Sequence, residues 1–311
     1  MEGLTIYHLR FTVEARDPIT FGEQPGAQLR GALYEALCAQ TGHDHNQHTP
    51  ENADHCPVCW LMLREDANAQ RGKDVPRAFT LRPPQQGDLR QYPSGMRFQF
   101  GVTFLGQAFT LFPYVALALP EMGRKGIGAT RGRFDVHAVE GVNLLTDAYE
   151  VLMQPGYNAV RRPQLCVTAE HIANHVEFLA PKQVTLRFLT PTRLIDGGEP
   201  VRTPAFRVVM GRLLERFDLI QAAYGGNTIP SPYESLLSAA AEVRLVKDDT
   251  KWHTIYSHST RTHSSSPISG FTGALTYEGH LVPFLPYLFW GQCLQIGKDT
   301  VKGNGVMQVV V

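Results

Sequence analysis

The sequence predicts an α+β protein made of two tandem halves that share one order of strands and helices. Two observations carry this prediction. Short stretches recur at one constant offset of 177 residues, and each half alternates apolar and polar residues first with the period of a strand and then with that of a helix. The matched positions are Leu9-Arg10-Phe11 with Leu186-Arg187-Phe188, Arg30 with Arg207, Leu37 with Leu214, Leu111 with Leu288, Phe112 with Phe289, Lys125 with Lys302, Gly126 with Gly303, and Gly128 with Gly305.

Each half is predicted to begin with a strand, at residues 4–14 and 184–190. A helix follows, because apolar residues then recur at the spacing of one helical face. Further strands are predicted at 96–104 and 270–277, and each half closes on a glycine-rich loop that leads into a last strand. Such a unit places helices on one face of an antiparallel sheet. The apolar helix positions are Leu29, Ala32, Leu33, Ala36 and Leu37 in the first half, and Phe206, Val209, Met210, Leu213, Leu214 and Phe217 in the second.

The expected domain organisation is an N-terminal domain at 1–142, a linker at 143–183 and a C-terminal domain at 184–311. The linker contains Pro155-Gly156 and Ala180-Pro181, which interrupt regular structure. Its fragment 168–178 is a candidate short helix.

Composition limits the class of protein. The 311 residues are 43% hydrophobic, which suffices for two cores, and Lys+Arg and Asp+Glu both total 29. A polyanionic partner must therefore be held by local basic patches. We expect no membrane segment, because the longest apolar stretches are far shorter than the ~20 residues a bilayer requires. Five cysteines, an odd number, fit a reducing compartment, so we expect the cytoplasm.

The two glycine-rich loops are candidate sites for a sugar–phosphate backbone. Glycine permits positive φ, clustered loop amides accept phosphate oxygens, and basic residues surround both loops. The spacing matches neither a Walker A loop nor a dinucleotide fingerprint, so a nucleotide cofactor is disfavoured. The alternative is that both loops are tight turns required only by the fold. The candidate contacts are Arg124, Lys125, Arg131 and Arg133 at the first loop, and Lys298, Lys302, Gly303 and Gly305 at the second.

The second half resembles the CRISPR precursor-RNA-processing endoribonucleases, within the RAMP superfamily of repeat-associated proteins with glycine-rich loops. The resemblance rests on LRFLTPTRL, on FRVVMGRLLERFDLI followed by AAYGG, on WHTIYSHSTR and GFTGALTYEGHL, and on PFLPYLFWGQCLQIGKDTVKGNG. The first half matches more loosely, through QLRGALYEAL, CPVC and GIGATRGRF. The resemblance implies two ferredoxin-like (RRM-like) domains, binding of CRISPR repeat RNA, and metal-independent cleavage that leaves a cyclic phosphate.

Metal-free RNA cleavage needs a base for the ribose 2′-hydroxyl, and histidine suits that task near neutral pH. The richest histidine stretch gives His43, His45 and His48, just after the first amphipathic helix. In members of the family a catalytic histidine often follows that helix, which also carries a tyrosine. We expect one of the three histidines as base, Tyr34 to orient the substrate and Arg30 to contact phosphate. The alternative for the histidines is a polar loop.

A structural zinc site is a competing use of the same region. Cys56 and Cys59 have zinc-knuckle spacing, with His55 beside them, and Cys38 or one of the three histidines could complete a tetrahedron. The alternative is two buried cysteines that pack as small apolar residues. Catalysis itself is expected to need no cofactor.

A third cluster precedes Gly270, where His258 and Arg261 are expected to contact RNA and not to carry chemistry. The first hypothesis is therefore a repeat-specific endoribonuclease that can stay bound to its product guide RNA. The second is a non-catalytic RNA-binding subunit of a CRISPR effector complex, which would contact other effector subunits. A third, more distant class is a zinc-dependent hydrolase, which chelation would reveal.

Overall fold

The computed structural model describes residues 3–41, 55–64, 75–85, 90–154, 159–226, 230–259 and 264–311. For Thr41, 257–259 and 264–267 it describes the backbone only. The chain divides into two compact units, an N-terminal unit of Thr5–Cys166 and a C-terminal unit of Val167–Val311 with Met1–Leu4. No helix in the described ranges is long and apolar enough to cross a membrane.

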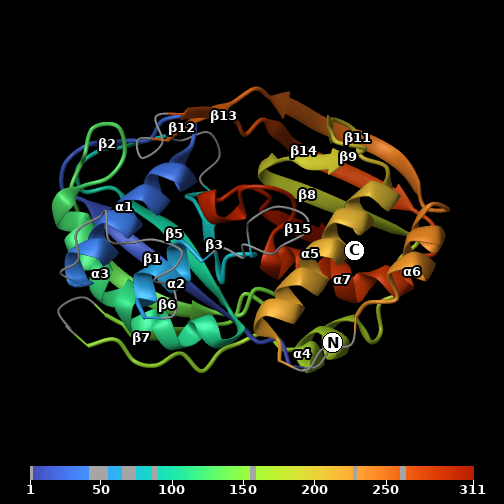
Figure 1. The fold of residues 1–311 in the computed structure, drawn as a ribbon, viewed down its shortest axis with the longest axis horizontal. Helices are drawn as coiled ribbons and strands as arrows, with labels where there is room; N and C mark the ends of the chain where they lie inside the picture. Colours follow the sequence, from blue (N-terminus) through green and yellow to red (C-terminus); the bar gives the residue numbers. More distant parts are fainter. Residues whose placement is uncertain are drawn as a thin grey trace. The chain divides into compact units, whose positions relative to one another are not determined.

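The N-terminal unit is a five-stranded antiparallel sheet with helices on one face (Figure 1). The strand order is β3-β5-β1-β6-β7. The elements of this unit are β1 (Ile6–Ala15), β2 (Ile19–Thr20), α1 (Pro25–Thr41), α2 (Pro57–Met62), β3 (Phe79–Arg82), β4 (Gln91–Tyr92), β5 (Arg97–Leu105), the 3-10 helix η3 (Gly106–Leu111), α3 (Phe112–Lys125), β6 (Phe134–Val142) and β7 (Tyr149–Met153).

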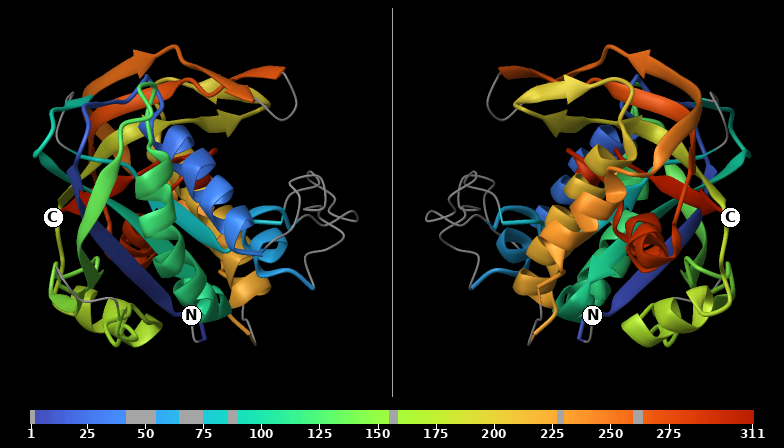
Figure 2. Two further views of the ribbon diagram at one scale, coloured as in Figure 1. Left: turned by 90° about the vertical axis from the view of Figure 1, so that its left-hand side faces the viewer. Right: turned by 90° about the vertical axis from the view of Figure 1, so that its right-hand side faces the viewer.

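Alternation along β1 produces the core of this unit. Leu9, Phe11 and Val13 are fully buried and face α1 and α3, whereas Thr12 and Glu14 point to the other face and are half-buried. The helices α1 and α3 contact each other and lie side by side in Figure 2. The predicted strand and helix of the first half are thus confirmed.

The C-terminal unit repeats this arrangement with a four-stranded sheet of order β11-β14-β8-β15. Its helices α5 and α7 contact each other and lie against the sheet (Figure 1). The elements of this unit are α4 (Ala169–Val176), β8 (Gln183–Thr192), β9 (Leu194–Asp196), β10 (Glu199–Val201), α5 (Phe206–Tyr224), α6 (Tyr233–Ala240), β11 (Arg244–His253), β12 (Tyr256–Ser259), β13 (Ser264–Pro267), β14 (Gly270–Glu278), the 3-10 helix η4 (Val282–Phe284), α7 (Leu285–Leu294), the 3-10 helix η5 (Thr300–Lys302) and β15 (Met307–Val310).

The two units share the ferredoxin-like topology. Along the chain, each unit runs strand–helix–strand–strand–helix–strand. In the sheet, the first of these strands lies between the third and the fourth: β1 lies between β5 and β6, and β8 lies between β14 and β15. The repeat extends to single glycines, because Gly126 and Gly303 have φ of 79° and 82°. Gly128 and Gly305 have φ of 75° and 74°. The predicted α+β fold of two tandem ferredoxin-like domains with glycine-rich loops is confirmed.

The segment expected as a linker, 143–183, contains regular structure in both units. Its strand β7 pairs with β6 at the edge of the N-terminal sheet. Its helix α4 packs on α7 of the C-terminal unit, and Thr168 caps that helix by accepting a hydrogen bond from the His171 backbone N–H at 3.3 Å. The two units meet in sequence between Cys166 and Val167, inside the expected linker.

A buried histidine lies on the face of the N-terminal sheet opposite the helices. His8 is 6% exposed, and a hydrogen bond of 2.8 Å joins its Nδ1 to Thr103 Oγ1. Gly101 provides the space, since a Cβ there would lie 2.4 Å from His8 Cε1. Burial, followed by the charges of Arg82 and Arg10, holds the pKa of His8 well below its ordinary value. The folded protein therefore keeps this ring neutral.

We predict that His8 makes the protein less stable as the pH falls below neutral. The unfolded chain protonates His8 near a pKa of about 6.5 while the folded chain does not, so each pH unit below that value favours unfolding by up to about 1.4 kcal/mol. Urea unfolding at several pH values measures the slope. His8→Gln should flatten it relative to the parent protein, and His280→Gln, at an exposed position, should not. Equal slopes in all three proteins would contradict the prediction.

Candidate nucleic-acid interface

A short glycine-rich loop, residues 126–133, joins α3 to β6 and is called here the N-terminal loop. Gly126 ends α3 by donating its N–H to Met122 O at 3.0 Å. Ile127 and Gly132 then pair with each other through two backbone hydrogen bonds of 2.9 and 3.1 Å. This pairing closes the loop and leaves Ala129, Thr130 and Arg131 exposed at its tip.

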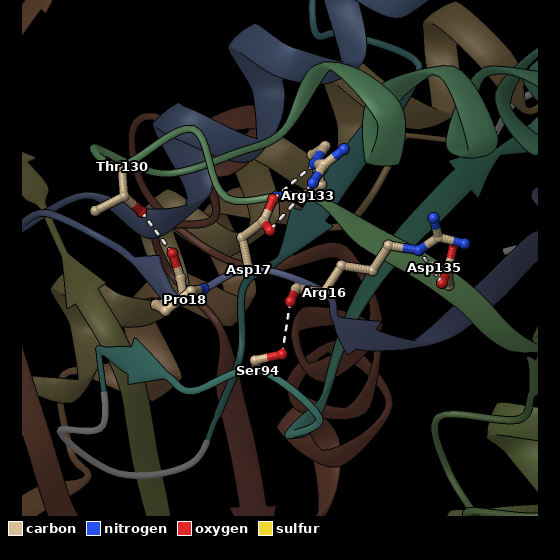
Figure 3. Close-up of polar contacts among 7 residues, drawn as sticks. All are labelled: Arg16, Asp17, Pro18, Ser94, Thr130, Arg133 and Asp135. Atoms are coloured by element: carbon tan, nitrogen blue, oxygen red, sulfur yellow. Dashed lines mark hydrogen bonds and ion pairs between the residues drawn. The ribbon is translucent and has the colours of Figure 1, made fainter.

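The N-terminal loop is fixed against the segment that follows β1 (Figure 3). Thr130 Oγ1 donates to Pro18 O at 3.0 Å and accepts from the Thr20 N–H at 3.1 Å. Ala129 N–H donates to Thr20 O at 2.7 Å. The approach is close enough that a Cβ on Gly128 would lie 2.5 Å from Thr20 O. Glycine is therefore required here both by its positive φ and by the space available.

Two ion pairs continue this contact beside the loop. Arg133 donates from Nε and Nη2 to the two carboxylate oxygens of Asp17 at 2.7 and 3.2 Å, as Figure 3 shows. These hydrogen bonds lower the pKa of Asp17 and raise that of Arg133. Arg16 donates from Nε to one carboxylate oxygen of Asp135, and Ser94 Oγ donates to Arg16 O at 2.6 Å.

Further ion pairs tie the N-terminal loop to α1. Arg131 at the loop tip pairs with the carboxylate of Glu35 at 3.0 Å, and Lys125 Nζ lies 3.4 Å from the carbonyl oxygen of Glu35. Arg124 and Lys125 also pair with Glu121 at 2.5 and 3.5 Å. The four basic residues predicted at this loop thus each have a carboxylate partner. Their side chains are solvent-accessible, and such pairs are weak and exchangeable.

The helix α1 places the predicted Arg30 and Tyr34 near α2. Arg30 is half-buried, and its Nη2 donates to Met62 O at 3.3 Å. Tyr34 hydrogen-bonds the buried thiol of Cys38, whose pKa burial nevertheless raises. Tyr34 directly precedes Glu35, the residue of α1 that pairs with the loop cation Arg131.

The predicted catalytic histidines His43, His45 and His48 lie outside the described residues. For the predicted zinc ligands, His55 is exposed, and Cys56 and Cys59 are buried at the start of α2. Within the described ranges, no three His, Cys, Asp or Glu side chains gather as a metal site. A four-ligand zinc site would therefore need residues from outside those ranges.

The second glycine-rich loop, residues 295–306, is called the C-terminal loop. Lys298 is exposed on it, and Lys302 pairs with Asp299 at 3.0 Å. Gly303 and Gly305 are buried and both have positive φ, and a Cβ on Gly305 would also meet the backbone at Ile296. Of the third predicted cluster, His258 lies in β12 but its side chain is not described, and Arg261 lies outside the described residues.

The carboxylates that pair with the basic residues were not singled out by the sequence. Glu121 stands three and four residues before Arg124 and Lys125, and helix spacing could have indicated that contact. Asp17 and Glu35 are 116 and 96 residues from their arginines, so only the fold brings them together.

Comparisons with known protein families assign the chain to a class and then to a family. A family model described as AF_1859_N, N-terminal domain, matches residues 4–165. A second, described as CRISPR-associated endoribonuclease Cas6, matches residues 186–307. The fold places the chain in the class of proteins built from two tandem ferredoxin-like units with glycine-rich loops. Within that class, the family model that matches residues 186–307 assigns the chain to the CRISPR repeat-processing endoribonucleases.

Solved structures of low sequence identity share the fold. A Cas6 product complex has a TM-score of 0.59 and 16% identity, with 98% of this chain and 99% of that chain covered. Thermus thermophilus Cas6 has a TM-score of 0.57 and 14% identity over all of both chains. A partial Cas6-RT-Cas1–Cas2 complex has a TM-score of 0.61 and 11% identity, covering 99% of this chain and 46% of that one. A search of curated proteins finds no match.

We predict that Gly128→Ala destabilises the protein by about 1–3 kcal/mol, because the new Cβ meets Thr20 O at a positive φ. Gly31→Ala is the matched control. It lies exposed within α1 with no atom within 4 Å of the added Cβ, so it should stabilise by up to about 1 kcal/mol. Denaturant unfolding measures both changes. A neutral Gly128→Ala would show that the loop does not depend on this contact.

Proposed function

We propose that this protein cleaves CRISPR precursor RNA within the repeat, without a catalytic metal, and stays bound to the guide RNA it produces. The observation that carries the proposal is the exposed N-terminal loop, which Arg131 ties to Glu35 beside Tyr34 on α1. The ion pair of Arg131 with Glu35 supports the proposal because it holds a cation of the loop against α1, the helix that carries the proposed tyrosine.

The proposed reaction is an internal transfer at one phosphate. A base removes the proton of the ribose 2′-hydroxyl, and the 2′-oxygen attacks the adjacent phosphorus. The bond from phosphorus to the 5′-oxygen breaks, and that oxygen takes up a proton. The products carry a 2′,3′-cyclic phosphate and a 5′-hydroxyl. We assign the base to one of His43, His45 and His48, with Tyr34 as a substrate-orienting residue.

Charge on the N-terminal loop supports binding of the RNA backbone. Arg131 and Arg133 are exposed and already hold carboxylates, and a guanidinium that pairs with a carboxylate also fits a phosphate. RNA phosphates would replace Glu35 and Asp17 as partners. Because these contacts are to phosphates and not to bases, they contribute affinity for RNA. Recognition of the repeat sequence requires other contacts, made to the bases.

Metal has no step in this proposal, and any zinc held with Cys56 and Cys59 would be structural. The second candidate function, a non-catalytic RNA-binding subunit that contacts other CRISPR effector proteins, shares the same fold. One structural neighbour is a chain of a partial Cas6-RT-Cas1–Cas2 complex, and this protein covers 46% of that chain. The cleavage experiment below separates the two functions.

We predict that the purified protein cleaves a labelled CRISPR repeat RNA in excess EDTA and fails on a substrate with a 2′-deoxy group at the cut site. Mass spectrometry of the products should find a cyclic phosphate, since the 2′-oxygen is the nucleophile. Binding of both RNAs without cleavage would favour the effector-subunit function. Cleavage that EDTA abolishes would contradict the metal-free mechanism.

We also predict that Arg131→Gln and Arg133→Gln each weaken RNA binding and lower the slope of log K against log salt by roughly 0.7, since each removes one phosphate contact. The matched control is Arg244→Gln, because Arg244 is an exposed arginine of the C-terminal unit that pairs with Glu278 at 2.6 Å. It should leave the slope as it is. Equal slopes in all three variants and the parent would exclude the N-terminal loop as a phosphate-binding site.

A further inference from the structure

The C-terminal loop is held to its unit on two sides by backbone contacts. At the end of β8, Pro191 O accepts from the Gly305 N–H at 3.1 Å, and Arg193 O accepts from the Lys298 N–H at 3.2 Å. Across the loop, the Ile296 N–H donates to Gly305 O at 3.0 Å. These bonds fix the two ends of the loop but not its middle.

A single side chain from α5 reaches the remaining part. Arg216 Nη2 donates to Leu294 O at 2.8 Å and to Thr300 Oγ1 at 3.0 Å, and its Nε donates to Gln295 O at 2.9 Å. Leu294 is the last residue of α7, Gln295 is its C-cap, and Thr300 is buried in the middle of the loop. One guanidinium therefore joins α5, the end of α7 and the loop.

The chemistry of this contact is unusual for an arginine. Among the residues that the structure describes, none of its hydrogen-bond acceptors is a carboxylate, and burial lowers its pKa to about 10. The positive charge of the buried guanidinium is stabilised by the carbonyl end of α7, which carries partial negative charge. By contrast Arg212, one turn earlier on α5, pairs with Glu215 at 2.9 Å. Burying a cation against neutral acceptors costs free energy. That cost indicates that the protein requires the arrangement of α5, α7 and the loop that Arg216 holds.

The N-terminal unit has no counterpart of this arginine. The constant offset between the halves places Ala39 at the equivalent position, and Ala39 is exposed and has no side-chain donor. In that unit surface ion pairs tie the loop instead, through Arg131 and Arg133. The C-terminal loop is thus anchored from inside, which leaves Lys298 exposed and without a carboxylate among the contacts described for it.

We propose that Arg216 is a positioning residue for RNA binding, which holds the C-terminal loop through Thr300 so that Lys298 and the loop backbone meet a phosphate of the RNA. This inference rests on the proposed RNA-binding function. Arg216 acts through the loop and does not itself touch RNA. The proposed base belongs to the other unit, so Arg216 affects binding and not the chemical step.

The test compares Arg216→Met and Thr300→Val with the control Arg212→Met in the full chain. The probe is a CRISPR repeat RNA with a 2′-deoxy group at the cut site for Kd, and the unmodified RNA for the single-turnover cleavage rate at saturating protein. A third readout is amide exchange of residues 296–305 without RNA. We expect Arg216→Met to raise Kd by about tenfold or more and Thr300→Val by about two- to fivefold. Both should speed exchange in the loop, and the saturating cleavage rate should stay within about twofold of the parent.

Folded variants with the parent's Kd and loop exchange would overturn the inference, even if their melting temperature fell, since that result means a purely structural role. If Arg216→Met does not fold, Thr300→Val decides, because it removes only the hydroxyl on the loop side. Arg212→Met should change none of the readouts. If the parent binds no repeat RNA, the proposed function fails and this inference fails with it. If the parent binds and the folded variants bind equally well, only the inference fails.

Discussion

The structure depends on the close approach of backbone to backbone at the glycines of the two loops. In the N-terminal unit a Cβ on Gly126 would lie 2.1 Å from Arg131 O, and in the C-terminal unit a Cβ on Gly305 would lie 1.8 Å from Ile296 O. No other residue type fits either place, and both glycines have positive φ. The loops therefore keep one conformation, and that conformation decides which cations reach the surface.

The two units use the same turn for different electrostatic arrangements. Around the N-terminal loop, exposed arginines hold carboxylates that RNA phosphates would displace. Under the C-terminal loop, Arg216 is desolvated and holds neutral carbonyl and hydroxyl oxygens. A duplicated fold with equal numbers of basic and acidic residues can in this way expose cations at both loops: ion-paired arginines at the first, and Lys298 at the second, where the loop is held by the buried Arg216. That accounts for an RNA-handling protein without an excess of basic residues.

The sequence predicts the fold well because the fold depends on local patterns. Alternation in 4–14 and 184–190 and the helical spacing of Leu29, Leu33 and Leu37 depend on neighbours in the chain, and β1, β8 and α1 confirm them. The repeat even gives the glycines with matching φ. The site is harder to predict from the sequence, because the fold alone brings Asp17 and Glu35 to their arginines. In the sequence, Arg216 cannot be told apart from an ion-paired helix cation such as its neighbour Arg212. The strand in the expected linker was missed, since Pro155-Gly156 suggested irregular chain although β7 ends just before it.

The central claim is that each of the two glycine-rich loops binds RNA. Amide exchange of the whole chain, measured with and without a 2′-deoxy repeat RNA, tests it most directly. The account predicts slower exchange at 128–131 and 297–303 when RNA is bound, with little change in α6 (Tyr233–Ala240). Bound RNA that leaves exchange at both loops unchanged would contradict it.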